Sequence, residues 1–308
     1  MNKSGEADSI FVDASGDSLT FTTDELGAFA DSSEMTMRVL RDALRVRSLE
    51  ILPGSTSGLR LSDDDGRMLP LHVPCDAVTG LTALITRSFE ADLVAFADGV
   101  IRRHAEPVCL IDIGANVGLF TRQLLSTLRD RITCVHAYEP HPSNFELLSR
   151  NLAGIALVNL HPAGLGDRQA TSNLYTDPEN CGNFSFLRDA MPARHDSISA
   201  DMWSAGAQEG DWLSSGVPIF YKSDTQGLDE LIATSLSDGF WDAVVGGVME
   251  VWCLPGKILD EDRFAAFLDH FDNKVMRSHP RQKLSTEGIV RSLAANPGLF
   301  NDLLFWKN

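Results

Sequence analysis

Positive charge is scarce in this 308-residue sequence. Lysine and arginine number 26 against 43 aspartates and glutamates, which gives a formal net charge of −17. A surface this acidic repels phosphate groups. We therefore predict no nucleic-acid partner and no docking on an anionic membrane.

Cysteine and long apolar runs are scarce as well. The five cysteines are an odd number, lie far apart and form no CxxC pair. This pattern predicts neither a disulfide framework nor a zinc module, and it is typical of free thiols in a reducing compartment. No apolar run reaches the ~18 residues of a membrane helix, and the first residues show no signal-peptide pattern. We therefore predict a cytoplasmic protein.

The first 80 residues differ from the rest. They are polar and rich in turn-forming residues, and two short apolar stretches at 59–61 and 68–73 flank the acidic segment 63–66. This arrangement predicts a β-hairpin with an acidic turn. We expect residues 1–80 to form an accessory region and residues 81–308 to form the main domain.

From residue 81 onward, helical and strand patterns alternate. Strands are expected at 108–113, 132–138, 156–160, 217–221, 243–252, 274–277 and 302–306. Helices are expected at 93–101, 119–128, 144–152, 228–236 and 264–271. Only the polar stretch 166–215, with weak strand signals, interrupts the pattern. The alternation predicts an α/β fold with a doubly wound parallel sheet, whose ligands bind beyond the carboxyl ends of the strands.

The segment 112–118, with the sequence DIGANVG, follows a buried strand and opens a helix. Gly114 permits a tight turn and a close approach to a ligand, and Gly118 lets the helix start close to the strand. Glu139 ends the next strand, where a carboxylate can accept hydrogen bonds from ribose hydroxyls. Together these features indicate a cofactor that contains a nucleoside.

Two cofactor classes compete for this loop. A dinucleotide site has the pattern G-x-G-x-x-G, but here Asn116 stands where the middle glycine would be. Asp112 precedes the first glycine by two residues, and a carboxylate there suits the ammonium and sulfonium groups of S-adenosylmethionine better than a pyrophosphate. The loop therefore favours S-adenosylmethionine over a nicotinamide cofactor.

A second motif, 220–227 with the sequence FYKSDTQG, ends the fourth expected strand of the main domain. Lys222 and Asp224 are two residues apart and so share a face of a strand. At the strand's carboxyl end they could orient or deprotonate a substrate hydroxyl. The alternative is that Asp224 or Thr225 caps the following helix.

These motifs together, with Tyr138-Glu139-Pro140 and Leu165-Gly166-Asp167, resemble the FkbM family of S-adenosylmethionine-dependent methyltransferases. The last family motif usually reads K-x-D-x-[EQ]-G. The resemblance covers about residues 85–255. It implies a class I methyltransferase fold, Rossmann-like and doubly wound, with seven strands of which the last is antiparallel. It also implies methyl transfer to hydroxyl groups of sugars or natural products such as polyketides.

The resemblance also implies roles for single residues. The cofactor-binding residues would be Asp112, Gly114, Asn116, Gly118, Glu139 and Asp167. Among them, Glu139 would hold the ribose and Asp167 would reach the adenine amine, although Asp167 also fits an ordinary Gly-Asp turn.

For catalysis we expect Asp224 as the base or hydroxyl orienter, Lys222 as its charge partner, and His161 as the next candidate base. We predict no metal site, because a hard cation needs several oxygen ligands and Asp224 alone does not supply them. Trp203 and Trp212 are the aromatic residues we expect at the acceptor site.

Two other readings remain open from the sequence: a nicotinamide-dependent oxidoreductase, and a non-catalytic scaffold with the same fold. The sequence identifies neither the acceptor nor the oligomeric state.

Overall fold

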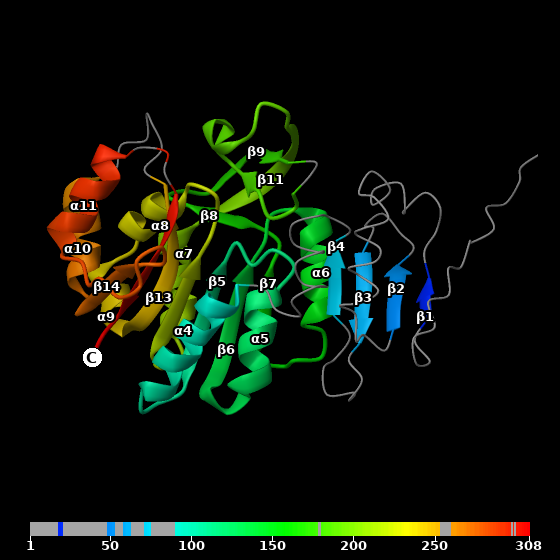
Figure 1. The fold of residues 1–308 in the computed structure, drawn as a ribbon, viewed down its shortest axis with the longest axis horizontal. Helices are drawn as coiled ribbons and strands as arrows, with labels where there is room; N and C mark the ends of the chain where they lie inside the picture. The colour runs from blue at the N-terminus through cyan, green and yellow to red at the C-terminus, as the bar shows by residue number, and fades with distance from the viewer. Residues whose placement is uncertain are drawn as a thin grey trace, which may run out of the picture.

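The computed structural model describes residues 18–20, 48–52, 58–62, 71–74, 90–177, 180–252, 260–296, 298 and 300–308. Its centre is a seven-stranded sheet in the order β14-β15-β13-β12-β5-β6-β7 (Figure 1). The strands are β5 (Val108–Ile113), β6 (Ile132–Tyr138), β7 (Val158–His161), β12 (Ile219–Ser223), β13 (Val244–Val251), β14 (Asn273–Met276) and β15 (Asn301–Trp306). Neighbours are parallel, except that β15 is antiparallel to β13 and β14.

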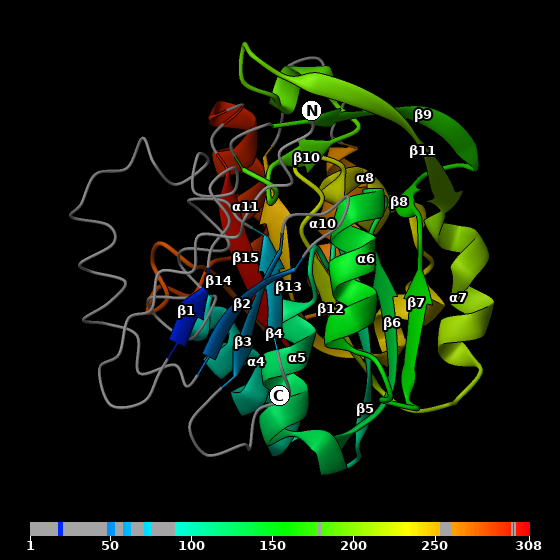
Figure 2. The same ribbon diagram turned by 90° about the vertical axis from the view of Figure 1, so that its right-hand side faces the viewer.

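Helices cover both faces of this sheet (Figures 1 and 2). One face carries α4 (Ala91–Arg103), α5 (Leu119–Thr127) and α6 (Pro142–Asn151). The other carries α7 (Ala205–Leu213), α8 (Asp229–Ser235), α9 (Asp238–Ala243), α10 (Glu261–Asp269) and α11 (Thr286–Ala295). The predicted class I methyltransferase fold is therefore confirmed, including its antiparallel last strand.

The apolar patterns explain these two layers. Along β5, Leu110 packs into the core under α4–α6, and Ile111 packs into the core under α7–α11. A central strand is buried on both faces, which is why its sequence is almost continuously apolar. Helix α4 has a single apolar side, from Leu93 to Ile101, and buries that side against the sheet. None of the helices in the described ranges is long and apolar enough to cross a membrane.

The polar stretch after β7 folds into a second, four-stranded sheet in the order β10-β9-β11-β8. Its strands are β8 (Gly164–Gly166), β9 (Ala170–Thr176), β10 (Phe184–Ser185) and β11 (Asp196–Ser204). Side chains along most of β9 alternate between exposed and partly buried. Because one face of this sheet meets solvent, its strands carry few apolar residues and the sequence signal is weak.

Before the main domain, β1 (Ser18–Thr20), β2 (Ser48–Leu52), β3 (Gly58–Ser62) and β4 (Leu71–Pro74) form a sheet in that order. Strands β3 and β4 pair antiparallel. The acidic turn predicted at 63–66 lies outside the described residues, and the division at residue 80 stays a prediction. Two short 3-10 helices also occur: η1 (Arg129–Arg131) precedes β6, and η2 (Arg188–Ala190) lies between β10 and β11.

Candidate functional site

The loop after β5 is shaped by the backbone of a neighbouring loop. Gly114 has a φ of +71°, and a Cβ there would lie 1.8 Å from the carbonyl oxygen of Asp224. Gly118 has a φ of +83°, and its Cβ would lie 2.7 Å from Leu148 on α6. Both positions therefore require glycine. We had assigned Gly114 to a close approach of ligand and Gly118 to packing on the strand, whereas their near neighbours are the loop after β12 and helix α6.

Asp112 and Lys222 are register partners on β5 and β12. Lys222 Nζ lies 3.2 Å from Asp112 Oδ1 and donates a hydrogen bond of 2.8 Å to the Gly114 carbonyl. Thr121 donates to the other oxygen of Asp112 at 2.6 Å. Burial alone would lower the pKa of Lys222, but the charge of Asp112 raises it, so the lysine stays charged.

This ion pair changes two expectations. Lys222 is paired with Asp112 rather than with Asp224. Asp112 is fully buried, and the described residues that line the cavities of the site do not include it. Its carboxylate therefore holds the lysine that supports the Gly114 loop, and it does not face a cationic ligand directly.

Glu139 follows β6, and only 4% of its surface is exposed. Its two oxygens accept hydrogen bonds from the backbone N–H groups of Asn116, at 2.9 Å, and His141, at 2.8 Å. Burial raises the pKa of Glu139 to about 7, although these two bonds act in the opposite direction. Each carboxylate oxygen can accept a further bond, so the group can still receive two hydroxyl donors.

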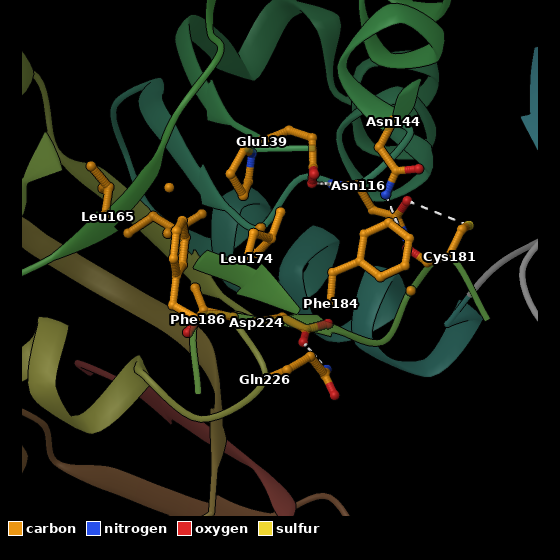
Figure 3. Close-up of a pocket in the computed structure, with 16 residues that line it drawn as sticks. Asn116, Glu139, Asn144, Leu165, Leu174, Cys181, Phe184, Phe186, Asp224 and Gln226 are labelled. Atoms are coloured by element: carbon orange, nitrogen blue, oxygen red, sulfur yellow. Dashed lines mark hydrogen bonds between the residues drawn. The ribbon is translucent and has the colours of Figure 1, made fainter. Parts of the chain in front are cut away.

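A small cavity lies beside Glu139 (Figure 3). Its polar side is formed by Gly114, Asn116 and Glu139, and its apolar side by residues of the second sheet and the loop before β10: Leu165, Leu174, Cys181, Phe184 and Phe186. The volume is about 50 Å³. That is room for about one or two water molecules, at roughly 30 Å³ each. A purine base can enter only if this apolar wall moves.

A larger cavity of about 580 Å³ adjoins the first. The two share Gly114, Asn116, Gly182, Asp224 and Gln226 in their linings. Its volume falls within the roughly 300–1,000 Å³ typical of ligand pockets. It opens beyond the carboxyl ends of β5 and β12, the position predicted from the fold.

Three carboxyl groups lie in the polar wall of the larger cavity. Glu90, Asp224 and Glu250 line it, and Lys222 is the one lysine or arginine among the described lining residues. Gln226 Nε2 donates to Asp224 at 2.7 Å and to Glu250 at 3.0 Å. Burial, followed by the charge of Asp224, raises the pKa of Glu250 well above its ordinary value and that of Glu90 to about 7. The cavity is therefore suited to a neutral or cationic group.

Asp229 was missed by the sequence analysis, yet it fixes the loop that carries Asp224. It is fully buried and accepts hydrogen bonds from the Thr225 N–H, at 3.1 Å, and the Thr225 hydroxyl, at 2.8 Å. Ser223 Oγ and the Gly227 N–H donate to it as well. Burial raises its pKa to about 7. The only sequence feature that could have pointed to Asp229 is its place in the first turn of α8, where an acidic residue is common.

His161 and Asp167 lie elsewhere than expected. His161 stacks on Tyr138, with ring centroids 4.2 Å apart, and its Nε2 is 3.2 Å from His136 Nδ1. Asp167 is exposed and pairs with Arg168 at 3.6 Å. The described residues that line the two cavities include neither of them. The structure thus gives no support to His161 as a base or to Asp167 as an adenine contact.

The tryptophans also lie elsewhere than the sequence predicted. Trp212 is fully buried and donates to the Tyr138 hydroxyl at 3.0 Å, and Trp203 packs edge-on against His161. Full burial keeps Trp212 away from any acceptor, and Trp203 is not among the described residues that line the two cavities. Trp252 lines the larger cavity together with Phe300, with ring centroids 5.3 Å apart.

A scan against protein-family models and a search of curated proteins both give no match. Solved structures do resemble the chain. The methyltransferase FkbM from Methylobacillus flagellatus KT is 14% identical over 65% of this chain, with a TM-score of 0.36. The 23S rRNA methyltransferase ErmE is 13% identical over 71% of this chain and 68% of its own, with a TM-score of 0.32. P. horikoshii TYW2, solved with MeSAdo, is 13% identical over 94% of this chain and 88% of its own, with a TM-score of 0.36.

The Rossmann-like fold of this chain follows from its own strand order and antiparallel last strand, and these structures resemble it only loosely. This chain covers 44% of the length of the FkbM protein, so membership of that family stays a prediction. ErmE is named for an RNA substrate, and the comparison therefore lends no support to our exclusion of nucleic acid. That exclusion rests on net charge alone.

Proposed function

We propose that this protein binds S-adenosylmethionine and transfers its methyl group to a hydroxyl oxygen of a sugar or natural product. The observation that carries the proposal is the Glu139 carboxylate, which lines the small cavity beside the Gly114 loop. This cavity adjoins the larger one, and Asp224 lines both. A carboxylate at this place in a doubly wound sheet is suited to ribose hydroxyls.

The residues present fit S-adenosylmethionine at its ribose, its adenine ring and its ammonium group. Glu139 would accept from the ribose, and the shared wall at Gly114 and Asn116 would lie along the nucleoside. The apolar surfaces of Leu165, Phe184 and Phe186 suit an adenine ring, once this wall moves outward to enlarge the small cavity. The donor's ammonium group would meet carboxylates of the larger cavity.

When bound, the donor supplies a methyl group attached to a positively charged sulfur. The protein's own contribution is alignment: the acceptor oxygen must face the methyl carbon, opposite the sulfur. Asp224 lines both cavities, and Gln226 holds one of its oxygens. We infer that the other oxygen orients the acceptor hydroxyl and takes its proton as the carbon–oxygen bond forms and the electrons of the carbon–sulfur bond return to sulfur.

The acceptor should be neutral or positively charged. Asp224 faces the larger cavity, so an anionic acceptor would meet repulsion from its carboxylate. The raised pKa values of Glu90 and Glu250 would fall beside a bound cation, so these two groups would add negative charge only for a cationic acceptor. An amino sugar or an uncharged polyol fits this wall better than a sugar phosphate. Stacked Trp252 and Phe300 offer an apolar surface for the face of a ring.

The first experiment is calorimetric titration with S-adenosylhomocysteine, the product of donor demethylation, with NAD as the control ligand. We expect the first to bind and NAD not to bind. Binding of NAD alone would establish the oxidoreductase instead. Binding of neither, at several pH values, would favour the non-catalytic scaffold.

Once an acceptor is found, Asp224→Asn tests the chemistry. We expect donor affinity within about twofold of the original and turnover lower by about 10²–10⁴-fold, the usual contribution of a general base. Arg168→Gln, an exposed charge change outside the cavities, is the control. Turnover that survives in Asp224→Asn would make Asp224 a structural residue.

A further inference from the structure

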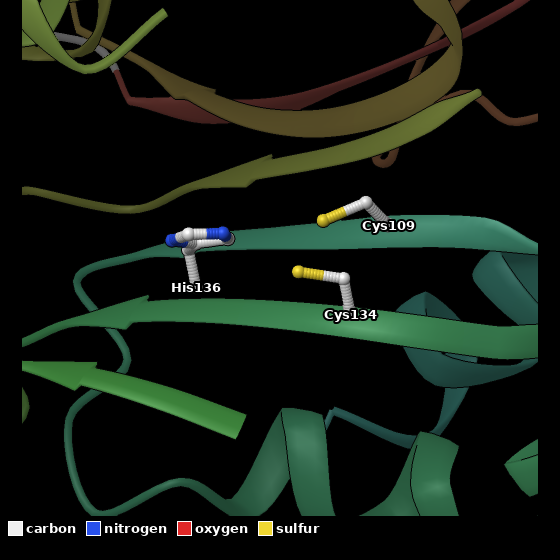
Figure 4. A group of neighbouring side chains, drawn as sticks. All are labelled: Cys109, Cys134 and His136. Atoms are coloured by element: carbon white, nitrogen blue, oxygen red, sulfur yellow. The ribbon is translucent and has the colours of Figure 1, made fainter. Parts of the chain in front are cut away.

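Two cysteines and a histidine that lie far from the cavities come together on β5 and β6. Cys109 and Cys134 are register partners on these parallel strands. His136 is two residues after Cys134 and therefore points to the same face of the sheet. One side-chain ligand atom from each of the three lies within 4.8 Å of the others (Figure 4).

The surroundings of this cluster hold it in place. Cys109 is fully buried in the core under α7–α11, His136 is 9% exposed, and Cys134 is partly exposed. His136 Nδ1 lies 3.2 Å from His161 Nε2, which leaves its Nε2 for another partner. In Figure 4 one ring nitrogen of His136 is directed toward the two sulfur atoms. A ligand histidine is typically oriented in this way by a partner on its second nitrogen.

We propose that Cys109, Cys134 and His136 bind a zinc ion. Two sulfurs and one imidazole nitrogen form a donor set typical of tetrahedral zinc, with bonds of about 2.3 Å to sulfur and about 2.0 Å to nitrogen. Donor atoms in such a site are roughly 3.5–3.8 Å apart, so side-chain rotations within the present cluster suffice. The fourth ligand would be a water molecule on the partly exposed side of Cys134.

A thiolate is the form of cysteine that binds a metal. Zinc binding should therefore release thiol protons, which calorimetry in buffers of different ionisation enthalpy can detect.

This ion would lie outside the two cavities. Cys109 precedes Gly114 by five residues, and a strand rises about 3.3 Å per residue, so the cluster lies roughly 16 Å from the Gly114 loop. Zinc there would join β5 to β6 on the face covered by α7–α11. It would act independently of S-adenosylmethionine, so this inference does not rest on the proposed function.

The test begins with the full-length protein. Its zinc content is measured as purified and after loading with zinc followed by gel filtration, and cobalt(II) is loaded in a parallel sample. We expect about one ion per chain, a thiolate-to-cobalt charge-transfer band, and the visible bands of tetrahedral cobalt. Zinc should also raise the melting temperature in a concentration-dependent way.

Variants identify the ligands. Cys134→Ser and His136→Gln should lose the ion, whereas Cys181→Ser, outside the cluster, should retain it. No bound metal after loading, full retention in Cys134→Ser, or a cobalt spectrum without a thiolate band would each overturn the proposal. A Cys109–Cys134 disulfide that forms on mild oxidation of a protein that binds no metal would identify a redox pair instead. If the variants fail to fold, the cobalt spectrum of the original protein decides.

Discussion

At the scale of single residues, burial controls what Glu139 can do. Its carboxylate lies 4% exposed at the cavity wall, and its pKa is raised to about 7. The charged form accepts hydroxyl donors more strongly than the protonated form, because hydrogen bonds to charged groups contribute about 1.5–3 kcal/mol. Donor binding should therefore depend on pH near neutrality.

We predict that affinity for S-adenosylhomocysteine decreases as the pH falls below about 7 and that this decrease is absent in Glu139→Gln. At pH 8, Glu139→Ala should bind roughly 10- to 150-fold more weakly, since each 1.4 kcal/mol is about tenfold. Glu146→Gln, on a side chain 38% exposed on α6, is the matched control. Unchanged binding by a folded Glu139→Ala protein would refute the ribose assignment.

Gly114 is the second residue whose role is set locally. An added Cβ would collide with the Asp224 carbonyl at 1.8 Å, whereas at Gly154 no atom lies within 4 Å. Both glycines have positive φ, +71° and +76°. Gly154→Ala should therefore lose only the roughly 1–2 kcal/mol of left-handed strain.

We predict that Gly114→Ala loses about 1–3 kcal/mol more than Gly154→Ala, from overpacking against backbone that cannot rotate away. Urea unfolding of the two variants measures this difference. Equal losses would mean that the loops after β5 and β12 do not touch as described.

At the scale of elements, the loop from Ser223 to α8 depends on one carboxylate. Asp229 accepts hydrogen bonds from Ser223, Thr225 and Gly227 of that loop. Asp224 lies between the first two of these donors in the sequence. Asp229 touches neither cavity directly among the described lining residues, so it acts by positioning.

Asp229→Ala should reduce stability by about 1–3 kcal/mol, because buried donors lose their acceptor. Turnover should fall more than acceptor KM changes, since Asp224 is displaced and the cavity wall otherwise remains. Asp229→Asn should restore part of the loss. Asp262→Ala, exposed on α10, is the control for both measurements. A stability loss with unchanged turnover would separate the loop from catalysis.

Elements also differ in how far their sequence predicts them. Strand β5, its loop and α5 were predicted almost to the residue, because burial on both faces and glycine at a turn are local signals. The second sheet was not, since its strands are half-exposed. Helices α7, α9 and α11 were missed. Helix α7 lies in the polar stretch where only weak strand signals were found, α9 has six residues, and α11 buries only Ile289 and Leu293 along its length.

At the scale of the whole molecule, several buried carboxyl groups influence stability together. Burial raises the pKa of Glu90 and Glu139 from 4.5, and that of Asp229 from 3.8, to about 7. The folded protein therefore binds more protons than the unfolded chain between these values. Their contribution to stability is fully present below the unfolded pKa values and is lost as the pH rises through about 7.

We therefore predict that the free energy of unfolding without ligand decreases from about pH 4.5 to pH 7. Two histidines act in the opposite direction, because burial lowers the pKa of His161 from 6.5 to about 4 and also lowers that of His141; the three carboxyl groups together outweigh them. Burial and Arg277 act oppositely on Asp92, whose pKa is lowered overall, so Asp92 titrates below this window. Urea unfolding across pH 4.5–8 tests this, and the double variant Glu139→Gln, Asp229→Asn should show a shallower decline. A rise in stability across the window would show that these groups are charged in the folded protein.

The alternating elements, the doubly wound sheet, and the position of Glu139 and the Gly114 loop at its carboxyl edge could be predicted from residue order alone. Periodicity and turn chemistry are local, so they can be read without coordinates. Which charges pair and which face the cavity depends on how the strands and loops come together in space. Asp112 is neutralised by Lys222, 110 positions later, while Glu90 and Glu250 line the cavity. Likewise, Cys109 and Cys134 become neighbours only through the register of two parallel strands, because pairing between strands is a long-range contact that residue spacing does not encode.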